Sequence, residues 1–492
     1  LYFTLCSSIY KRKFQELQLK PKKRIKMKKQ LIYRIFILGA VPLLLASCFA
    51  AKEYERPQEL IDETYYRTDA IEQDSINMAV VSWRELFSDP ILQEHIETGL
   101  ENNIDIRVAL QQILAAEANF KQGKAGYFPT LDATAQMTHQ ELSSNSQFGG
   151  LFSSLDQYEL SASLSWEADI WGKIRSNKRA FGAQYLQTVE AHKAVKTQLV
   201  AMIASSYYQL LALDEQLRVT EETIETRSSS LETTKALKEA GNVTEVGVKQ
   251  TEAQLYTAQA LRIDLINEIR LLENSFSILL GQQPGAIERD GLRNQEIETS
   301  LKTGVPAQLL VNRPDVRASE FALINAFELT NVARSNFYPS LTLSASGGLQ
   351  ALQIDELFDT NSLFATIIGG LTQPIFNRRS IKTQYEVAQA QQEQARLQFK
   401  QALLTASREV SDALYTYEAA TEKLDVKRKE FESYNTATEY SEELLDNGLA
   451  NYLEVLTARE NALNSSLDLI NTRLTQLQSV VDLYEALGGG WQ

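Results

Sequence analysis

The most regular pattern in the chain is an apolar residue at every seventh position, in two separate stretches. The first contains Ile203, Leu210, Leu217, Ile224 and Leu231; the second contains Val410, Tyr417, Leu424, Phe431 and Leu445, with Thr438 as the exception. Apolar residues repeated at intervals of seven over several helical turns are typical of a coiled-coil seam. They predict two long helical hairpins, over residues 173–280 and 382–487. A helix of about 67 residues would extend roughly 100 Å at 1.5 Å per residue.

Alternation of apolar and polar residues occurs in two pairs of shorter stretches and predicts strands. We expect them at residues 129–142, 157–171, 338–350 and 362–376. The apolar series of the last strand is Phe364, Thr366 and Ile368. About ten residues cross a bilayer when a strand is tilted, although two water-soluble hairpins would give the same pattern. Trp166, Trp171 and Phe376 lie near predicted strand ends, where the aromatic girdles of membrane strands are found.

Both patterns occur twice because the sequence itself repeats. Residues 103–107 recur as residues 313–317, and the segment around Pro129 recurs around Pro339. Each half predicts the same order of a helix, two strands and a long helical hairpin. The predicted repeats are residues 88–281 and 313–487, with a preceding segment at 48–87, a linker at 282–312 and a tail at 488–492.

Residues 27–47 have the basic start and apolar run of a secretory signal. They end in Leu45-Ala46-Ser47, and together with Cys48 this resembles a bacterial lipobox, in which the cysteine is acylated and becomes the first residue after cleavage. Because a complete signal begins at Met27, we expect residues 1–26 to be an upstream mis-start. The alternative is an uncleaved anchor with an incidental cysteine.

Composition and charge exclude several classes of protein. With 23% charged residues the chain is too polar for a bundle of membrane helices. Residues 1–47 hold eleven Lys and Arg and one acid, so the remaining 38 basic and 62 acidic residues leave a net charge of −24. Such an acidic body disfavours nucleic acid as a partner. Three histidines far apart give no metal site, and we find no phosphate loop or hydrolase motif, so we expect neither an enzyme nor a cofactor.

Four strands cannot close a barrel alone, and an open sheet edge in lipid leaves unpaired backbone groups. Three subunits of four strands would give about twelve, within the range of membrane barrels. The fold class expected from these patterns is therefore a mixed α+β membrane protein that forms an oligomeric, lipid-anchored tube, in which long helices continue a barrel shared between subunits.

Several motifs in order resemble the outer-membrane efflux factor family (TolC-like), in particular the lipoproteins that pair with resistance-nodulation-division pumps. The most specific is residues 304–317, continuing through Glu320 to Tyr338-Pro339; supporting matches are residues 54–57, 83–90 and 486–491. The resemblance implies a homotrimer, a twelve-stranded barrel in the outer membrane of a Gram-negative bacterium, a helical barrel in the periplasm and an equatorial belt, to which residues 48–87 and 282–312 would belong. The implied partners are a periplasmic adaptor, an inner-membrane pump and outer-membrane lipid.

If this is an exit duct, transport is passive and the moving parts are the hairpin tips, near residues 240–246 and 447–453. Gly241-Asn242 and Asn447-Gly448 permit the tight reversals. The acidic residues beside the second tip could form a ring in the trimer, or they are simply a solvated helix end: Asp446, Glu442 and Glu443.

Arg313-Pro314-Asp315 is interpreted as a structural corner rather than a catalytic site. Asn312 can cap a helix, Pro314 fits its first turn, and Asp315 lies at the positive end of the helix dipole. Two other functions remain open: an outer-membrane duct for type I protein secretion, and a periplasm-spanning lipoprotein without a pore. The lipobox and residues 309–317 favour efflux of small molecules.

Overall fold

The computed structural model describes residues 51–57, residues 81–295 apart from 148 and 152, and residues 312–491. Residues 1–47 with the predicted signal, the predicted lipidation site Cys48, and parts of both predicted connecting segments (58–80 and 296–311) lie outside the described residues. The described elements are, in order, α3 (Trp83–Leu86), α4 (Pro90–Asn102), α5 (Ile104–Ala125), β1 (Thr130–Glu141), β2 (Ser154–Ala168), α6 (Lys173–Glu239), α7 (Glu245–Leu279), η3 (Leu292–Asn294), α9 (Pro314–Ser335), β3 (Ser340–Ala351), η5 (Ile354–Glu356), η6 (Thr360–Ser362), β4 (Leu363–Thr372), α10 (Ser380–Asp446) and α11 (Tyr452–Ala486).

The two halves of the chain give elements of matching order and length. α6 and α10 each have 67 residues, and α7 and α11 each have 35. Each long pair is preceded by two strands and by a helix of 22 residues, α5 or α9. The mixed α+β fold with four strands and long helices is therefore as predicted. Among the described helices, none combines the length and the apolar character needed to span a membrane.

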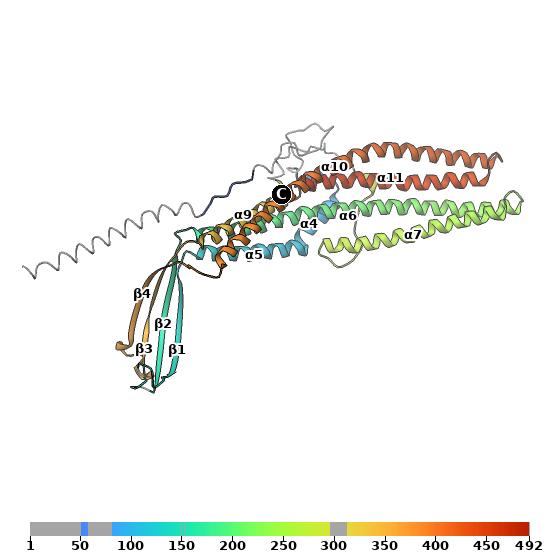
Figure 1. Ribbon diagram of the computed structural model, residues 1–492. Coiled ribbons are helices and arrows are strands. Elements are labelled where there is room, and N and C mark those ends of the chain that lie inside the picture. The colour runs from blue at the N-terminus through green and yellow to red at the C-terminus, as the bar shows by residue number, and fades with distance from the viewer. Residues whose placement is uncertain (1–50, 58–80, 148, 152, 296–311, 492) are drawn as a thin grey trace, which may run out of the picture. The chain divides into compact units, whose positions relative to one another are not determined.

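The described chain forms two compact units. The strand unit holds the described residues of 1–55, 120–181 and 325–392, and the helical unit holds those of 56–119, 182–324 and 393–491. In the strand unit, β1, β2, β3 and β4 form one antiparallel sheet in sequence order (Figure 1). β4 ends at Thr372, four residues before the predicted end, because Pro374 has no backbone N–H to donate to a sheet.

In the helical unit the long helices run in pairs, α6 with α7 and α10 with α11 (Figure 1). The predicted seam of α6 is buried at Ile203 and Leu210, and Leu231 packs with Val248 and Leu255 of α7 farther along. In the second half, Val410 is fully buried on α10. The cluster of Leu231 with Val248 and Leu255 therefore shows that part of the first seam packs against the partner helix, as burial of an apolar stripe requires.

The four long helices end in the same way. Just after each helix, a glycine at positive φ donates its N–H to the carbonyl three residues before it. The residue after this glycine donates its N–H to the carbonyl five residues before itself. The four glycines are Gly241, Gly281, Gly448 and Gly488. This is the Schellman arrangement, which satisfies carbonyls that a helix end leaves without partners.

Candidate functional site

The register of the sheet gathers apolar residues on one face and polar residues on the other. Crossing the sheet at one level, Leu131 faces Leu164, which faces Ala345, which faces Ile367. On the opposite face, the apolar residues are largely replaced by Asp, Glu, Gln, Ser and Thr. Leu131 is 72% exposed and Ile367 is 78% exposed. One face therefore suits contact with hydrocarbon and the other contact with water.

The register corrects the predicted phase of the last strand. Phe364, Thr366 and Ile368 were predicted on the apolar face, but Thr366 pairs with Ser346 and Ile368 with Ser344, on the polar face. The apolar face of β4 is instead made by its odd-numbered residues: Leu363, Ala365, Ile367, Gly369 and Leu371. Large apolar residues occur at both the odd-numbered and the even-numbered positions of β4. Alternation within this strand therefore could not show which of its two faces is the apolar one.

The aromatic residues predicted for a girdle have different environments. Phe376 is 87% exposed, as a girdle residue would be in an isolated subunit. Trp171 is buried instead: its ring stacks on Tyr338 with 4.8 Å between centroids, and its Nε1 donates to the carbonyl of Pro339 at 2.7 Å. The prediction that Trp171 belongs to a girdle is wrong, because its ring packs and its N–H is hydrogen-bonded within the strand unit, so neither faces lipid.

The two predicted prolines stand directly before the strands that open each pair. Pro129 precedes β1 and Pro339 precedes β3. A proline at this position loses no ladder hydrogen bond. Pro339 has the additional role of accepting the Trp171 hydrogen bond described above.

The predicted tip residues form two similar turns. Gly241 has φ +81° and Gly448 has φ +72°, and neither has an atom within 4 Å of the place where a side chain would start. Asn242 donates its N–H to the carbonyl of Leu237 at 2.9 Å. Asn447 donates its side-chain N–H to the carbonyl of Glu443 at 2.8 Å. The tips are thus ordered turns in which the glycine supplies the left-handed backbone.

The three acidic residues predicted near the second tip do not have equivalent surroundings. Glu442 is held by Arg459 of α11, whose Nε and Glu442 Oε1 are 2.7 Å apart. Glu443 is exposed. Asp446 ends α10, and its side chain lies outside the described part of the chain. Arg459 also donates to the hydroxyl of Ser230 on α6. It therefore links the second hairpin to the first, a role the sequence did not reveal.

A second link between the hairpins lies farther from the tips. Arg227 of α6, whose side chain is 3% exposed, pairs with Glu460 of α11 at 2.7 Å. Its Nη1 also donates to the carbonyl of Gln254 on α7. Removing Glu460 would leave the buried guanidinium of Arg227 without its carboxylate, whereas Glu460 is 40% exposed and can be solvated when Arg227 is removed.

The Arg313-Pro314-Asp315 segment is a corner held by charge. α9 begins at Pro314, so Arg313, and not the predicted Asn312, occupies the capping position. The buried guanidinium of Arg313 forms a two-pronged pair with Asp315, at 3.0 and 2.6 Å, and donates to Glu409 of α10 at 2.7 Å. Burial lowers the pKa of Arg313, but its bonds to these carboxylates raise it by more, so the group remains charged.

Arg313 also donates to the carbonyl of Ala486, the last residue of α11, at 3.0 Å. The equivalent residue of the first repeat, Asn103, donates to the carbonyl of Leu279, the last residue of α7, also at 3.0 Å. The same position therefore fastens the end of the returning helix in both halves. Asn103 does so without charge, and its side-chain oxygen also accepts the N–H groups of α5 at Asp105 and Ile106.

The corner of the second repeat adjoins a cavity of about 500 Å³ in which carboxylates outnumber Arg313. Besides Asp315 and Glu409, its wall includes Asp482 and Glu485 of α11. Burial raises the pKa of Glu485 to about 7, and repulsion from Asp482 and Glu409 adds to the effect while Arg313 opposes it. Near neutral pH this carboxyl therefore exchanges a proton, a property the sequence pattern did not predict.

The comparisons with known proteins agree with this architecture. The outer membrane efflux protein family matches residues 96–282 and again residues 305–489, and the chain belongs to this family. It is 29% identical over 457 residues to the solvent efflux pump outer membrane protein SrpC of Pseudomonas putida, covering 91% of this chain and 97% of that protein. It is 26% identical over 455 residues to the probable outer membrane lipoprotein SilC of Salmonella typhimurium, with the same coverage.

Among solved structures, the open state of the Neisseria gonorrhoeae MtrE outer membrane channel superimposes with a TM-score of 0.79. The two sequences are 25% identical, and the match covers 90% of this chain and 98% of that one. The predicted family and its location, the outer membrane of a Gram-negative bacterium, are confirmed.

Proposed function

We propose that three copies of this chain join their sheets into one twelve-stranded barrel and form the passive exit duct of a tripartite efflux pump. The observation that carries the proposal is a single sheet with one apolar face, one polar face and two outer edges, β1 and β4. Backbone groups left unpaired in hydrocarbon cost several kcal/mol each. Joining β4 of one copy to β1 of the next gives these groups partners, and the polar faces then line a common lumen.

Two unmatched stripes on the helices support a contact between copies. On α7, Tyr256, Ile263, Leu271 and Ile278 are all more than half exposed and lie within about 80° around the helix at 100° per residue. On α10 the exposed residues of one face are Leu397, Leu404, Tyr415, Val426, Tyr440 and Leu444. Stripes on two different helices suit the head-to-tail contacts of a closed ring. The helices would continue the barrel as a tube in the periplasm.

The gate in this proposal is at the tips. Opening separates the second hairpin from the first, and therefore breaks the links that Arg459 and Arg227 make between them. Asp446 and Glu443 would form an acidic ring when three tips meet, while Glu442 holds Arg459 in place. Acylation of Cys48 would anchor each subunit, as the name of SilC suggests for that protein. The adaptor and the inner-membrane resistance-nodulation-division pump would supply energy and choice of substrate, so the duct itself passes small molecules without a dedicated site.

The proposal is tested by native mass spectrometry and planar-bilayer recording of the acylated protein. We expect a trimer with cation-preferring channels, and we expect Asp446→Ala to raise closed-state conductance and weaken the cation preference. The control is Asp425→Ala, which removes an exposed acid paired with Lys429 on the same helix. A stable single subunit would overturn the duct. A trimer whose conductance responds equally to both variants would overturn the acidic gate and leave the duct standing.

A further inference from the structure

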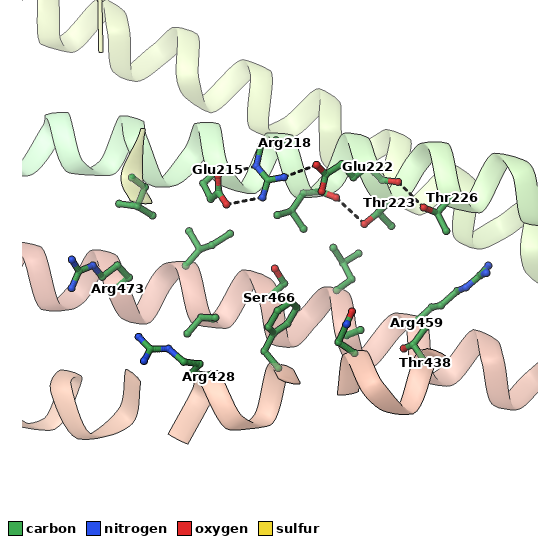
Figure 2. Close-up of a pocket in the computed structure, with 18 of the residues that line it drawn as sticks. Glu215, Arg218, Glu222, Thr223, Thr226, Arg428, Thr438, Arg459, Ser466 and Arg473 are labelled. Atoms are coloured by element: carbon green, nitrogen blue, oxygen red, sulfur yellow. Dashed lines mark hydrogen bonds and ion pairs between the residues drawn. The ribbon is translucent and has the colours of Figure 1, made fainter. Parts of the chain in front are cut away.

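Two cavities of the helical unit differ in how their acidic residues are held. The cavity in Figure 2 has a volume of about 840 Å³, and both glutamates of its wall are paired: Arg218 donates to Glu215 at 2.7 Å and to Glu222 at 2.5 Å. The second is the cavity of about 500 Å³ beside the Arg313 corner. Two carboxylates of its wall have no such partner among the described residues.

These carboxylates are Asp482 and Glu485, which lie three residues apart on α11 and therefore on the same face of the helix. Asp482 is exposed and Glu485 is half-buried, so the pair extends inward from the mouth of the cavity. Like charges at this spacing repel each other, and the C-terminal end of a helix, where both lie, disfavours negative charge. A cation bound by the two carboxylates would remove both unfavourable effects.

A third polar group of the cavity wall is the hydroxyl of Thr197 on α6. Thr197 is 7% exposed, and within the part of the chain that the structure describes its Oγ1 has no hydrogen-bond partner. Other buried threonines of the same helix, Thr220 and Thr234, donate to the carbonyl four residues before them. Because the hydroxyl of Thr197 accepts no bond from the protein, an N–H group of a ligand would supply the missing partner.

The fold of the corner does not require the acids of this cavity. α6 and α10 have equal lengths, as do α7 and α11, so each acid of α10 and α11 has a counterpart in the first repeat. Glu409, Asp412, Asp482 and Glu485 correspond in order to four uncharged residues, which are Met202, Ser205, Ser275 and Ile278. Asn103 fastens the end of α7 without any of these charges. The acids of the second repeat are therefore available to bind a cation.

The size and the walls of the cavity indicate the kind of cation. A volume of about 500 Å³ is much larger than a single metal ion and lies within the range of about 300–1,000 Å³ that is typical of sites for small organic molecules. An ammonium group has three N–H donors, and its hydrogen bonds to carboxylates are strong. The small side chains of Ala194, Ala413 and Ala486 leave room for an unbranched carbon chain between two such groups.

We infer that the cavity beside the Arg313 corner is a binding site for a short aliphatic diamine, whose ammonium groups are held by Asp482 and Glu485 and donate to the hydroxyl of Thr197. Binding at this site does not depend on the pore, because it is measured without any conductance.

The test is calorimetric titration of the full-length protein, held in discs of zwitterionic lipid, with 1,4-diaminobutane at about pH 8. The neutral 1,4-butanediol has nearly the same shape and serves as the matched ligand. We expect the diamine to bind at least about tenfold more tightly than the diol, because only the diamine carries charge for the carboxylates. Magnesium ions should bind more weakly than the diamine, since a single ion does not fill the cavity.

Three variants assign the binding to this cavity. Asp482→Asn should weaken diamine binding by about tenfold, whereas Asp468→Asn should change it by less than about twofold. Asp468 is an exposed acid of the same helix that pairs with Lys427 and lies outside the cavity. Thr197→Val retains the shape of the side chain without the hydroxyl and should weaken binding by about threefold.

The pH dependence of binding gives a second measurement, on the unmodified protein. The charged groups that face Glu485 are Asp482 of α11, Glu409 and Asp412 of α10, and Arg313 and Asp315 of the corner. Because the pKa of Glu485 is about 7, its ionised fraction rises from about one tenth at about pH 6 to about nine tenths at about pH 8, while an aliphatic amine stays charged. Diamine affinity should therefore rise by about tenfold over this range, and Glu485→Gln should abolish the rise.

Several results would overturn the inference even if the trimeric duct is established. They are equal binding of diamine and diol, equal effects of the changes at Asp482 and Asp468, tighter binding of magnesium ions than of the diamine, and a diamine affinity that does not rise with pH.

Discussion

Replacing Glu485 by glutamine should stabilise the protein at alkaline pH and leave it almost unchanged at acidic pH. Glu485 lies in the carboxylate-rich cavity beside Arg313, where burial, together with the neighbouring acids, raises its pKa to about 7. Its ordinary value is 4.5, which is also what the unfolded chain should show. The glutamine side chain has almost the same shape as the protonated carboxyl and cannot ionise.

The sign follows from counting protons in the two states. Between pH 4.5 and about 7, the folded protein retains a proton on Glu485 that the unfolded chain has lost. Stability therefore falls as pH rises through this window, and the full loss is present above it. A difference of 2.5 pKa units corresponds to about 3 kcal/mol at most, since one unit is about 1.4 kcal/mol. Partial access to water reduces this, so we expect a gain of about 1–3 kcal/mol for Glu485→Gln above pH 8.

The assay is thermal unfolding of the assembled protein, followed by circular dichroism in neutral detergent from about pH 5 to about pH 9. The melting temperature of the original protein should fall relative to that of Glu485→Gln as pH rises. Glu422→Gln removes an exposed carboxylate of α10 that is not part of the cavity wall and serves as the charge-matched control. Parallel pH profiles for the original protein and Glu485→Gln would refute the reasoning, as would a gain confined to acidic pH.

Three further predictions follow from the same structure. Ile367→Arg should destabilise the membrane-inserted protein by about 2–4 kcal/mol, measured by urea unfolding from lipid vesicles, and Thr366→Arg on the opposite face should cost much less. If Thr366→Arg cost more, the assignment of the apolar face of β4 would be wrong. Arg313→Met should cost about 1–3 kcal/mol in the same measurement, because it removes the donor to Asp315, Glu409 and the carbonyl of Ala486, and the two carboxylates are partly solvated. A neutral result would show that the corner is not held by charge. Gly488→Ala should lower the melting temperature more than Gly448→Ala. Both glycines have positive φ, but only at residue 488 would a Cβ meet a neighbour, 2.5 Å from the carbonyl oxygen of Asn312. Equal decreases in melting temperature would exclude a clash at residue 488.

Much of the architecture could be predicted from local pattern. A seam such as Ile203 to Leu231 repeats every seven residues because that spacing keeps one side of a helix against its neighbour, so the long hairpins were visible in the sequence. Alternation along Leu131 to Met137 similarly identified a two-faced strand. Gly241 and Gly448 marked the reversals because few other residues adopt the left-handed backbone easily.

The candidate sites were less predictable, because they join residues that are distant in the chain. The Arg313 corner combines α9, α10 and the end of α11, and nothing near residue 313 indicates that Glu409 and Glu485 lie beside it. Asp482 likewise belongs to an ordinary helix end until α6 and α10 bring Thr197 and Glu409 to the same cavity.

The sequence by itself determined which segments are helices and strands and where they turn, since these depend on periodicity and backbone freedom within a segment. Only the tertiary structure decided which face of β4 is apolar, why Trp171 is buried, and which charges share a cavity. The physical reason is that pairing and charge compensation depend on the partner: Ile367 and Ile368 are the same residue type, and the strand beside them places one against Ala345 and the other against Ser344.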